Sequence, residues 1–433
     1  MAVLQSQINN LRTIFRSLRY RNYRLFFIGQ AISLIGTWTQ LIAMPWLVYR
    51  LTGSALLLGV VSFATQIPVF ILTPFAGVLT DRWNRYYILI ITQALSMIQA
   101  LLLSVLFFTE AIQVWQIIIL SLALGLINAF DMPTRQAFVV EMVDNRKDLG
   151  NAIALNSMMF NSARLIGPSV AGVVIAAVGE GVCFFINAVS FLFVIVSLLM
   201  MKVPAPKTSV RKSHVLHELK EGLVYVAGFV PLRYMMLLLA LVSLVGMPYS
   251  VLMPIFAHKI LGGGPHTFGF LMGAAGIGAL TGATYLAAQK SIVGLVRILP
   301  AATAVFGGGL IAFSLSRWMW LSLPLMFLTG LGMITQIAAC NTIIQTIADD
   351  DKRGRVMSFY VMSFIGITPF GSLLAGFVAD WIGAPKTMMM GGILCVLAAG
   401  LFTRKLPEVK KEIHPVYIKL GILPATPSDL SRI

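Results

Sequence analysis

Two long apolar stretches of the chain are separated by Gly77-Val78-Leu79-Thr80-Asp81-Arg82-Trp83-Asn84-Arg85. We expect an apolar helix to end in this turn, which carries one carboxylate and two guanidiniums. Gly77 lets a neighbouring helix approach closely. Asp81, Arg82 and Arg85 are able to form ion pairs that break and re-form at a membrane surface. The turn therefore predicts a membrane protein with a gating charge lock at one end of its helices.

The composition is that of a membrane protein with many spans. Of the 433 residues, 58% are hydrophobic and 11% are charged, and the mean hydropathy is +0.87. Soluble domains carry about 25% charged residues. We count about twelve apolar spans of roughly 20 residues or more, the length that crosses a bilayer. They lie near 25–49, 55–80, 86–108, 114–138, 151–178, 181–201, 234–257, 267–289, 296–316, 318–346, 355–380 and 386–403.

The positive charges indicate an orientation. The net charge is +16, but the loops on one side of the predicted membrane hold only four of the 32 Lys and Arg residues, namely Arg50, Lys259, Arg317 and Lys386. Basic residues collect on the cytoplasmic side of membrane proteins. We therefore expect both termini in the cytoplasm, a location in the plasma membrane (the inner membrane of a bacterium), and no nucleic acid as partner. We expect no cleavable signal peptide before the first span.

The chain divides into two similar halves. Adding 204 moves Gly150, Gly167, Gly172 and Gly179 onto Gly354, Gly371, Gly376 and Gly383, and adding 205 moves Gly59, Gly77 and Gly125 onto Gly264, Gly282 and Gly330. Two parallel repeats of six spans are typical of secondary transporters, which bind substrate near the membrane midplane between the halves. The predicted segments are a basic N-terminal stretch (1–24), a six-helix bundle (25–201), a cytoplasmic linker with an amphipathic helix (202–233), a second six-helix bundle (234–403) and a cytoplasmic tail (404–433).

The charged turn resembles the loop between helices 2 and 3 of the major facilitator superfamily, Gly-x-Leu-Ala-Asp-Arg-x-Gly-Arg. Thr80 replaces the Ala, Asn84 replaces the second Gly, and Tyr86 replaces a basic residue that follows. The run from Asp131 to Pro168 is similar to the siderophore-exporter branch, the enterobactin exporters and their relatives. The resemblance implies an all-α membrane protein with 12 transmembrane helices in two pseudo-symmetric six-helix bundles, and proton-coupled export of drug-like or siderophore-like molecules.

The fifth span carries a polar stripe at helical spacing, Ser157, Asn161, Arg164 and Pro168. Arg164 lies about 13 residues into the span, hence ~18–20 Å from its start at ~1.5 Å per residue. A charge at this depth must face protein or water. It either binds an anionic group in a cavity or is a structural arginine satisfied by the fourth helix and Asn161.

Small residues and a proline follow Arg164. Gly167-Pro168-Ser169-Val170-Ala171-Gly172 predicts a bend at Pro168 and tight packing at Gly167 and Gly172. It resembles the Gly-Pro-x-x-Gly-Gly element of antiporters, which implies export. The alternative is an ordinary kinked helix.

Asp131 is the carboxylate that lies deepest in a predicted span. Desolvation favours its neutral form and a nearby guanidinium favours its charged form. We predict that it carries the coupling proton, or that it is a cap or a partner of Arg135. The arginine that family antiporters usually carry earlier in this span is absent from 116–128.

Other polar residues in spans are candidates for substrate contact or for helix packing. With Asn161 and Arg164, the predicted substrate-binding residues are Gln30, Thr37, Gln40, Tyr249 and Gln336. For the charge lock, Glu141 or Asp144 and the helix start near Gly354 are the predicted partners.

The sequence predicts a secondary-active exporter of amphipathic small organic molecules, with alternating access and protons as coupling ion. Alternatives are a facilitator-type importer of a polar nutrient and a membrane-embedded enzyme. No Gly-x-Ser-x-Gly turn, metal-spaced cluster or phosphate loop is found, so we expect no catalytic residues, no metal and no cofactor. We expect a monomer in the lipid bilayer with a small-molecule substrate.

Overall fold

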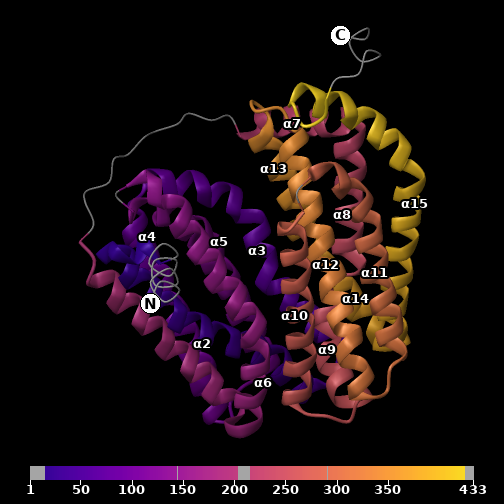
Figure 1. Ribbon diagram of the computed structural model, residues 1–433. Helices are drawn as coiled ribbons and strands as arrows, with labels where there is room; N and C mark the ends of the chain where they lie inside the picture. The colour runs from indigo at the N-terminus through magenta and orange to yellow at the C-terminus, as the bar shows by residue number, and fades with distance from the viewer. Residues whose placement is uncertain (1–14, 144, 203–214, 290, 425–433) are drawn as a thin grey trace, which may run out of the picture. The chain divides into compact units, whose positions relative to one another are not determined.

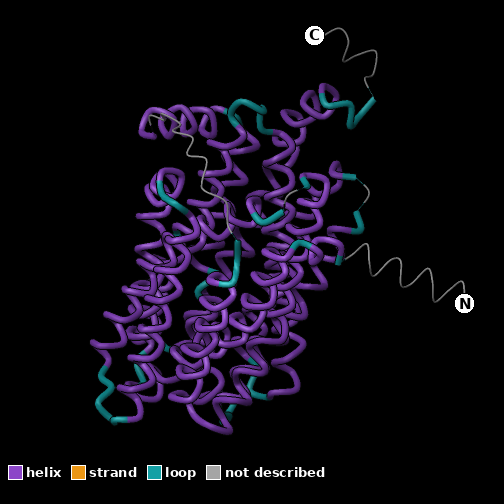
Figure 2. Tube along the Cα trace, turned by 90° about the vertical axis from the view of Figure 1, so that its left-hand side faces the viewer, coloured by secondary structure: helices purple, strands orange, loops and turns teal. Residues whose placement is uncertain are grey.

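The structure is a computed structural model that describes residues 15–143, 145–202, 215–289 and 291–424. Helices joined by short connections make up the described chain, and none of its residues lies in a β-strand (Figures 1 and 2). The chain forms two compact units. One is Met1–Arg211 with Met253–Gly273, and the other is Lys212–Leu252 with Ala274–Ile433.

The helices follow one another along the whole described chain. They are η1 (Arg16–Arg19), α2 (Arg21–Thr52), α3 (Ala55–Arg82), α4 (Arg85–Phe108), α5 (Val114–Glu141), α6 (Arg146–Leu199), α7 (Val215–Gly228), α8 (Val230–Val245), α9 (Tyr249–Ile255), η2 (Phe256–Ile260), α10 (Pro265–Ala287), η3 (Ile292–Gly294), α11 (Leu295–Leu315), α12 (Met319–Ile347), α13 (Arg353–Val361), η4 (Met362–Gly366), α14 (Thr368–Ile382) and α15 (Ala384–Lys419). η1 and η3 are 3₁₀ helices, and η2 and η4 are π-helices.

The long α6 is a hairpin of two helical arms. Gly179 interrupts it with φ 79° and ψ 171°, a conformation open essentially to glycine alone. Near its start, α2 contacts both arms, because Tyr23 donates to Ala152 O at 2.8 Å and Asn22 donates to Lys202 O just beyond the second arm at 2.9 Å. Near its other end, α2 contacts the Gly179 corner, because Arg50 forms an ion pair with Glu180.

The described chain has eleven helices that are long and apolar enough to cross a membrane, and α6 supplies two crossings in one of them. Twelve crossings were predicted, and the all-α fold of the prediction is confirmed. Gly383 makes the equivalent corner between α14 and α15, with φ 89° and ψ 150°. The glycine pair that the repeat predicted at an offset of 204 therefore occupies the same unusual backbone conformation twice.

Helix ends carry the expected caps. The Asn84 side chain accepts from the backbone N–H of Tyr86 at the start of α4, and Asn145 accepts from Lys147 at the start of α6. Both caps satisfy amide groups that the first helical turn leaves free. At the other end of a helix, Gly53 stops α2 in a left-handed conformation with φ 64°.

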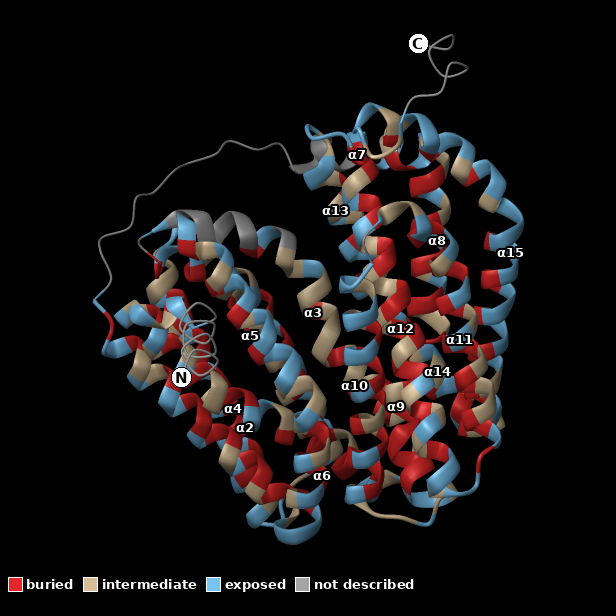
Figure 3. Cartoon of the chain, viewed as in Figure 1, coloured by how far each residue is buried: buried red, intermediate tan, exposed pale blue. Residues whose placement is uncertain are grey.

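Buried residues lie on the helix faces that pack against other helices of the same unit, while exposed apolar residues cover the rest (Figure 3). Exposed tryptophans lie close to helix ends, for example Trp318, Trp320 and Trp381. Lipid covers such apolar surfaces, and tryptophan favours the membrane–water interface. The surface therefore suits a bilayer.

Candidate functional site

The polar stripe of α6 faces away from the core of its unit. Ser157 and Asn161 are exposed and Arg164 is half-buried. Asn161 Nδ2 donates to Ser157 O at 2.8 Å, so the amide serves its own helix instead of Arg164. Within the described residues, no hydrogen bond or ion pair satisfies the Arg164 guanidinium. A cation in this position is available to a ligand.

Close packing against α2 surrounds the glycine that follows. A Cβ added to Gly167 would lie 2.5 Å from Trp38 Cγ, which explains why this position has no side chain. Pro168 is buried inside α6. Thr37, next to Trp38, is exposed and donates to Ser33 O in its own helix at 2.9 Å. α2 and α6 thus place Thr37 and Trp38 near the polar stripe.

At Gly172, α6 lies close to the start of α10, within the first unit. A Cβ on Gly172 would lie 2.6 Å from Pro265 O and 2.9 Å from Gly269 Cα. Ser169 Oγ donates to Gly269 O at 3.5 Å. Met253–Gly273 belongs to the predicted second bundle by sequence, but in the structure it groups with the first unit.

Asp131 lies at the centre of a buried polar cluster between α4 and α5. Its Oδ1 accepts from Thr92 Oγ1 at 2.9 Å and from Gln93 Nε2 at 2.8 Å. Its Oδ2 forms an ion pair with Arg135, one helical turn on. Only 2% of the Asp131 side chain and 18% of the Arg135 side chain is exposed. The carboxylate is thus the partner of Arg135, as one of the two interpretations of the sequence proposed.

The predicted charge lock is described in part. Arg85 at the start of α4 and Glu141 at the end of α5 form an ion pair at 2.6 Å. Gly77 and the side chains of Asp81 and Arg82 lie outside what the structure describes. The sequence therefore identified one pair that the structure brings together across two helices.

Two of the predicted substrate residues lie inside the first unit instead of on its polar stripe. Gln40 donates to Gln99 Oε1 at 3.1 Å and accepts from Asn187 Nδ2 at 2.7 Å. This network joins α2, α4 and α6, and Gln40 is only 4% exposed. Gln30, also on α2, is buried, and its Oε1 has no partner in the described part of the chain. These positions suit helix packing, the alternative reading of the sequence.

Tyr249 and Gln336 are buried in the second unit. The Tyr249 ring packs edge-on against Phe306 with centroids 6.2 Å apart. Gln336 is fully buried, and neither its Nε2 nor its Oε1 has a partner among the described residues. By the offset of 205, Gln336 is the counterpart of Asp131. The second half thus carries a neutral amide where the first carries a carboxylate.

A second buried carboxylate cluster was not predicted from the sequence. Asp148, in the first turn of α6, forms ion pairs with Arg16 at 3.0 Å and with Arg19 at 2.5 Å. It also accepts a hydrogen bond from Tyr20 at 2.7 Å. The hydrogen bond with Tyr20 and the charge of Asp148 hold the pKa of Arg19 above its usual value. The available signal was the Asn145 cap with an acid three residues later.

Arg50 and Glu180 form another pair that the sequence did not show. They meet at 2.9 Å beside the Gly179 corner, and the Glu180 side chain is 6% exposed. Arg50 also lies over the Phe107 ring at 5.7 Å. Among the described residues, no group of three or more His, Cys, Asp or Glu side chains is placed to hold a metal ion.

Residues 12–417 match the family described as "Transmembrane secretion effector". The chain belongs to this family. The staphyloferrin A transporter of Staphylococcus aureus is 26% identical over 396 residues, covering 90% of this chain and 98% of that protein. The multidrug efflux pump Tap of Mycolicibacterium fortuitum is 28% identical over 391 residues, covering 87% and 93%. These relatives are transporters, not enzymes.

Solved structures show the same fold. A bacterial homolog of the human lysosomal transporter Spinster superposes with a TM-score of 0.68 at 14% identity, over 91% of this chain and 98% of that one. A bacterial homologue of the iron transporter ferroportin has a TM-score of 0.67 at 16% identity, over 90% and 98%. The predicted relation to the major facilitator superfamily and its siderophore and drug transporters is confirmed, and the protein is a multi-pass membrane transporter.

Proposed function

We propose that this transporter exports amphipathic small organic molecules, siderophore-like or drug-like, by proton antiport with alternating access. The observation that carries the proposal is the Arg164 guanidinium on the exposed polar face of α6, which has no partner among the described residues. The relatives support the substrate class, since one is named for staphyloferrin A and another for multidrug efflux. The word efflux in the second name favours export over the import of a polar nutrient.

Arg164 sets the charge preference of the substrate. In a partly dehydrated site its field is screened far less than at the surface. Neutral and anionic amphiphiles, such as catecholate-like molecules, are therefore preferred over lipophilic cations. The planar guanidinium donates several hydrogen bonds in a fixed geometry, and Asn161 and Ser157 add polar contacts along the same face.

Asp131 carries the coupling proton. When it is ionised, it holds Arg135 of the same helix through an ion pair and accepts hydrogen bonds from Thr92 and Gln93 of α4. Protonation neutralises the carboxylate and removes the attraction that keeps the guanidinium in place. Proton binding thereby changes the packing of α5 against α4, which couples the proton to a conformational step. The Gln336 amide cannot take this role in the second half, because an amide does not titrate.

Gating is assigned to the turn between α3 and α4. Arg85 and Glu141 form an ion pair, and Asp81 and Arg82 are the other members of the lock that the sequence predicts. We place this turn and both termini in the cytoplasm and the protein in the bacterial inner membrane, because the basic residues concentrate on that side.

Transport in proteoliposomes tests the function. Purified protein is reconstituted with a pH-sensitive dye inside, and a siderophore, an anionic dye and a lipophilic cation are added in turn. We expect proton flux that depends on the anionic or neutral substrates. The absence of flux with every substrate, while a substrate gradient still drives exchange, would contradict proton antiport.

Competition binding in detergent tests the charge preference. Arg164→Lys keeps the charge but loses the planar set of hydrogen-bond donors. We expect it to bind anions about tenfold more weakly, or 1.4 kcal/mol. Arg164→Ala should weaken the binding of anions further and leave the binding of cations unchanged or stronger. Arg404→Ala, an exposed arginine on α15, is the matched control. Equal losses for anion and cation, with a lower melting temperature, would make Arg164 a structural residue.

A further inference from the structure

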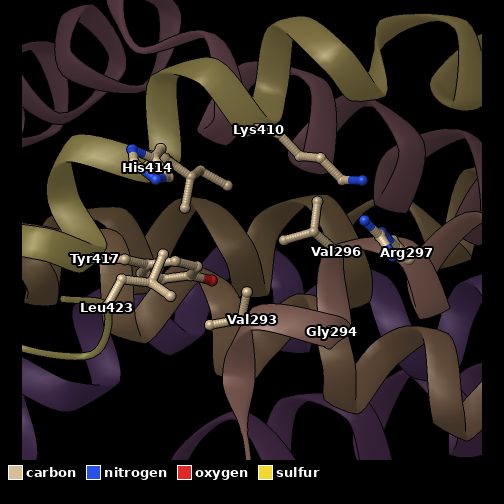
Figure 4. A pocket seen from close by; sticks show the side chains of 9 residues that line it. Val293, Gly294, Val296, Arg297, Lys410, His414, Tyr417 and Leu423 are labelled. Atoms are coloured by element: carbon tan, nitrogen blue, oxygen red, sulfur yellow. The ribbon is translucent and has the colours of Figure 1, made fainter. Parts of the chain in front are cut away.

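A cavity of about 260 Å³ lies in the second unit, where α11 begins and α15 ends. Arg297 from α11 and Lys410, His414 and Tyr417 from α15 contribute to its wall (Figure 4). It is separate from every residue assigned above to transport. The volume is below the roughly 300–1,000 Å³ of sites for drug-sized ligands, so it admits a smaller group.

Two cations converge on this cavity. Figure 4 shows the charged ends of Arg297 and Lys410 directed into the same space from opposite walls. Neither has a carboxylate or other hydrogen-bonding partner within the described chain. The nearby Glu408 pairs with Lys405 at 3.1 Å instead. Like charges brought together repel, and an anion between them removes the repulsion.

A buried hydroxyl without a partner lines the same cavity. Tyr417 is 3% exposed, and no group in the described chain bonds its hydroxyl. Its backbone O accepts from Ile422 N at 2.9 Å and Leu423 N at 3.3 Å, in a turn that Gly421 closes with φ 68°. This turn ends α15. A buried hydroxyl without a hydrogen-bond partner is unfavourable, so a ligand acceptor there is favourable.

The start of α11 adds a third attraction for an anion. Its cap residue, Gly294, provides no side-chain cap, and the first turn holds no acid. A Cβ at Gly294 would meet nothing within 4 Å, so the backbone is open to approach. The N-terminus of a helix favours negative charge. Arg297 lies in this same turn, where a cation without a counter-ion is unfavourable.

We propose that this cavity binds the phosphate group of a small anionic ligand. Arg297 and Lys410 neutralise the phosphate, the start of α11 faces the cavity, and the Tyr417 hydroxyl, on the other side of the cavity in Figure 4, donates a hydrogen bond to another oxygen of the ligand. Two sources have this chemistry, the headgroup of an anionic lipid and a free phosphate or phosphate ester. Binding would hold the end of α15 against α11.

Titration of the purified full-length protein in neutral detergent tests the site. The probes are dihexanoyl phosphatidylglycerol, dihexanoyl phosphatidylcholine and inorganic phosphate, with binding followed by calorimetry. The doubly substituted Arg297→Gln/Lys410→Gln should bind the anionic probe at least about tenfold more weakly, as expected for loss of hydrogen bonds to a charged group. Tyr417→Phe should weaken it severalfold. Lys411→Gln/Arg404→Gln, two exposed cations on α15, should bind like the wild type.

The outcomes separate the two sources. Binding of phosphatidylglycerol without inorganic phosphate identifies a lipid site, and binding of both identifies a site for the free phosphate group. The proposal is overturned if neither binds, if phosphatidylcholine binds equally well, or if both double variants lose affinity alike. If Arg297→Gln/Lys410→Gln does not fold, Tyr417→Phe decides, and an unchanged affinity in that variant overturns the proposal.

Discussion

Replacement of Asp131 by Asn separates the structural role of the carboxylate from its role in proton coupling. The Asn side chain keeps an oxygen for the hydrogen bonds that Thr92 and Gln93 donate at 2.9 Å and 2.8 Å. It loses the negative charge, so Arg135, whose side chain is 18% exposed, stays charged without its partner. Removal of one partner of a buried pair lowers stability by about 3–5 kcal/mol. Since Arg135 retains some solvent contact, we expect about 3 kcal/mol for Asp131→Asn.

A double variant tests this magnitude. Asp131→Asn/Arg135→Gln removes both charges and leaves no isolated guanidinium. We expect it to recover at least about 2 kcal/mol relative to Asp131→Asn, because contacting residues show interaction energies of about 0.5–3 kcal/mol. Asp349→Asn, which removes the exposed pair with Lys352, is the control and should change stability by less than about 1 kcal/mol.

The assay combines unfolding with transport. Unfolding of each variant is followed in mixed micelles with increasing sodium dodecyl sulfate, and uphill export is measured in proteoliposomes under a pH gradient. Both Asp131 variants should lose uphill export but keep downhill exchange, although the double variant is nearly as stable as the wild type. Wild-type stability of Asp131→Asn would refute the ion-pair argument, and uphill export by the stable double variant would refute the coupling assignment.

Three further substitutions test a close helix contact, a set of ion pairs and a hydrogen-bond network in the first unit. Gly172→Leu should lower stability by about 1–3 kcal/mol through overpacking and slow transport, whereas Gly150→Leu, with nothing within 4 Å of its added Cβ, should do neither; equal melting temperatures of the two would exclude the close approach. Asp148→Asn should lower the melting temperature more at low salt than at high salt, because its arginine partners are partly exposed; a loss independent of salt would argue against ion pairing. Gln40→Leu should lower stability by about 1–3 kcal/mol by leaving Asn187 without its acceptor, and unfolding in detergent would show no change if the network is dispensable.

The sequence predicts most of the fold because membrane spans have a strong signature. Apolar runs of bilayer length mark the helices, and the repeat offset relates Gly179 to Gly383, which share one backbone conformation in the structure. Arg85 and Glu141 were also predicted as partners. Arg85 begins α4 and Glu141 ends α5, the next helix in the chain, so the helix order alone brings the two residues together.

Partners distant in the chain were not predictable in the same way. The sequence showed polar residues such as Gln30 and Gln40 in the first span, but not whether they meet water or protein. Gln40 meets Gln99 and Asn187, 59 and 147 residues away. Asp148 likewise collects side chains about 130 residues earlier in the chain. No local rule connects such positions, since only the packing of helices decides which polar faces meet.

The glycine corners limit where the chain accepts foreign sequence. At Gly179 and Gly383 one residue makes the entire reversal, and a side chain there is strained by about 1–3 kcal/mol even though space is free. Neither corner has further loop residues that could hold an epitope tag, a protease site or a fluorophore-bearing cysteine. The connection at 109–113 between α4 and α5 is exposed for most of its length, and exposed loop tips tolerate insertion best. Reporters for measuring movement of the first unit therefore belong in the connection at 109–113, not at the Gly179 corner.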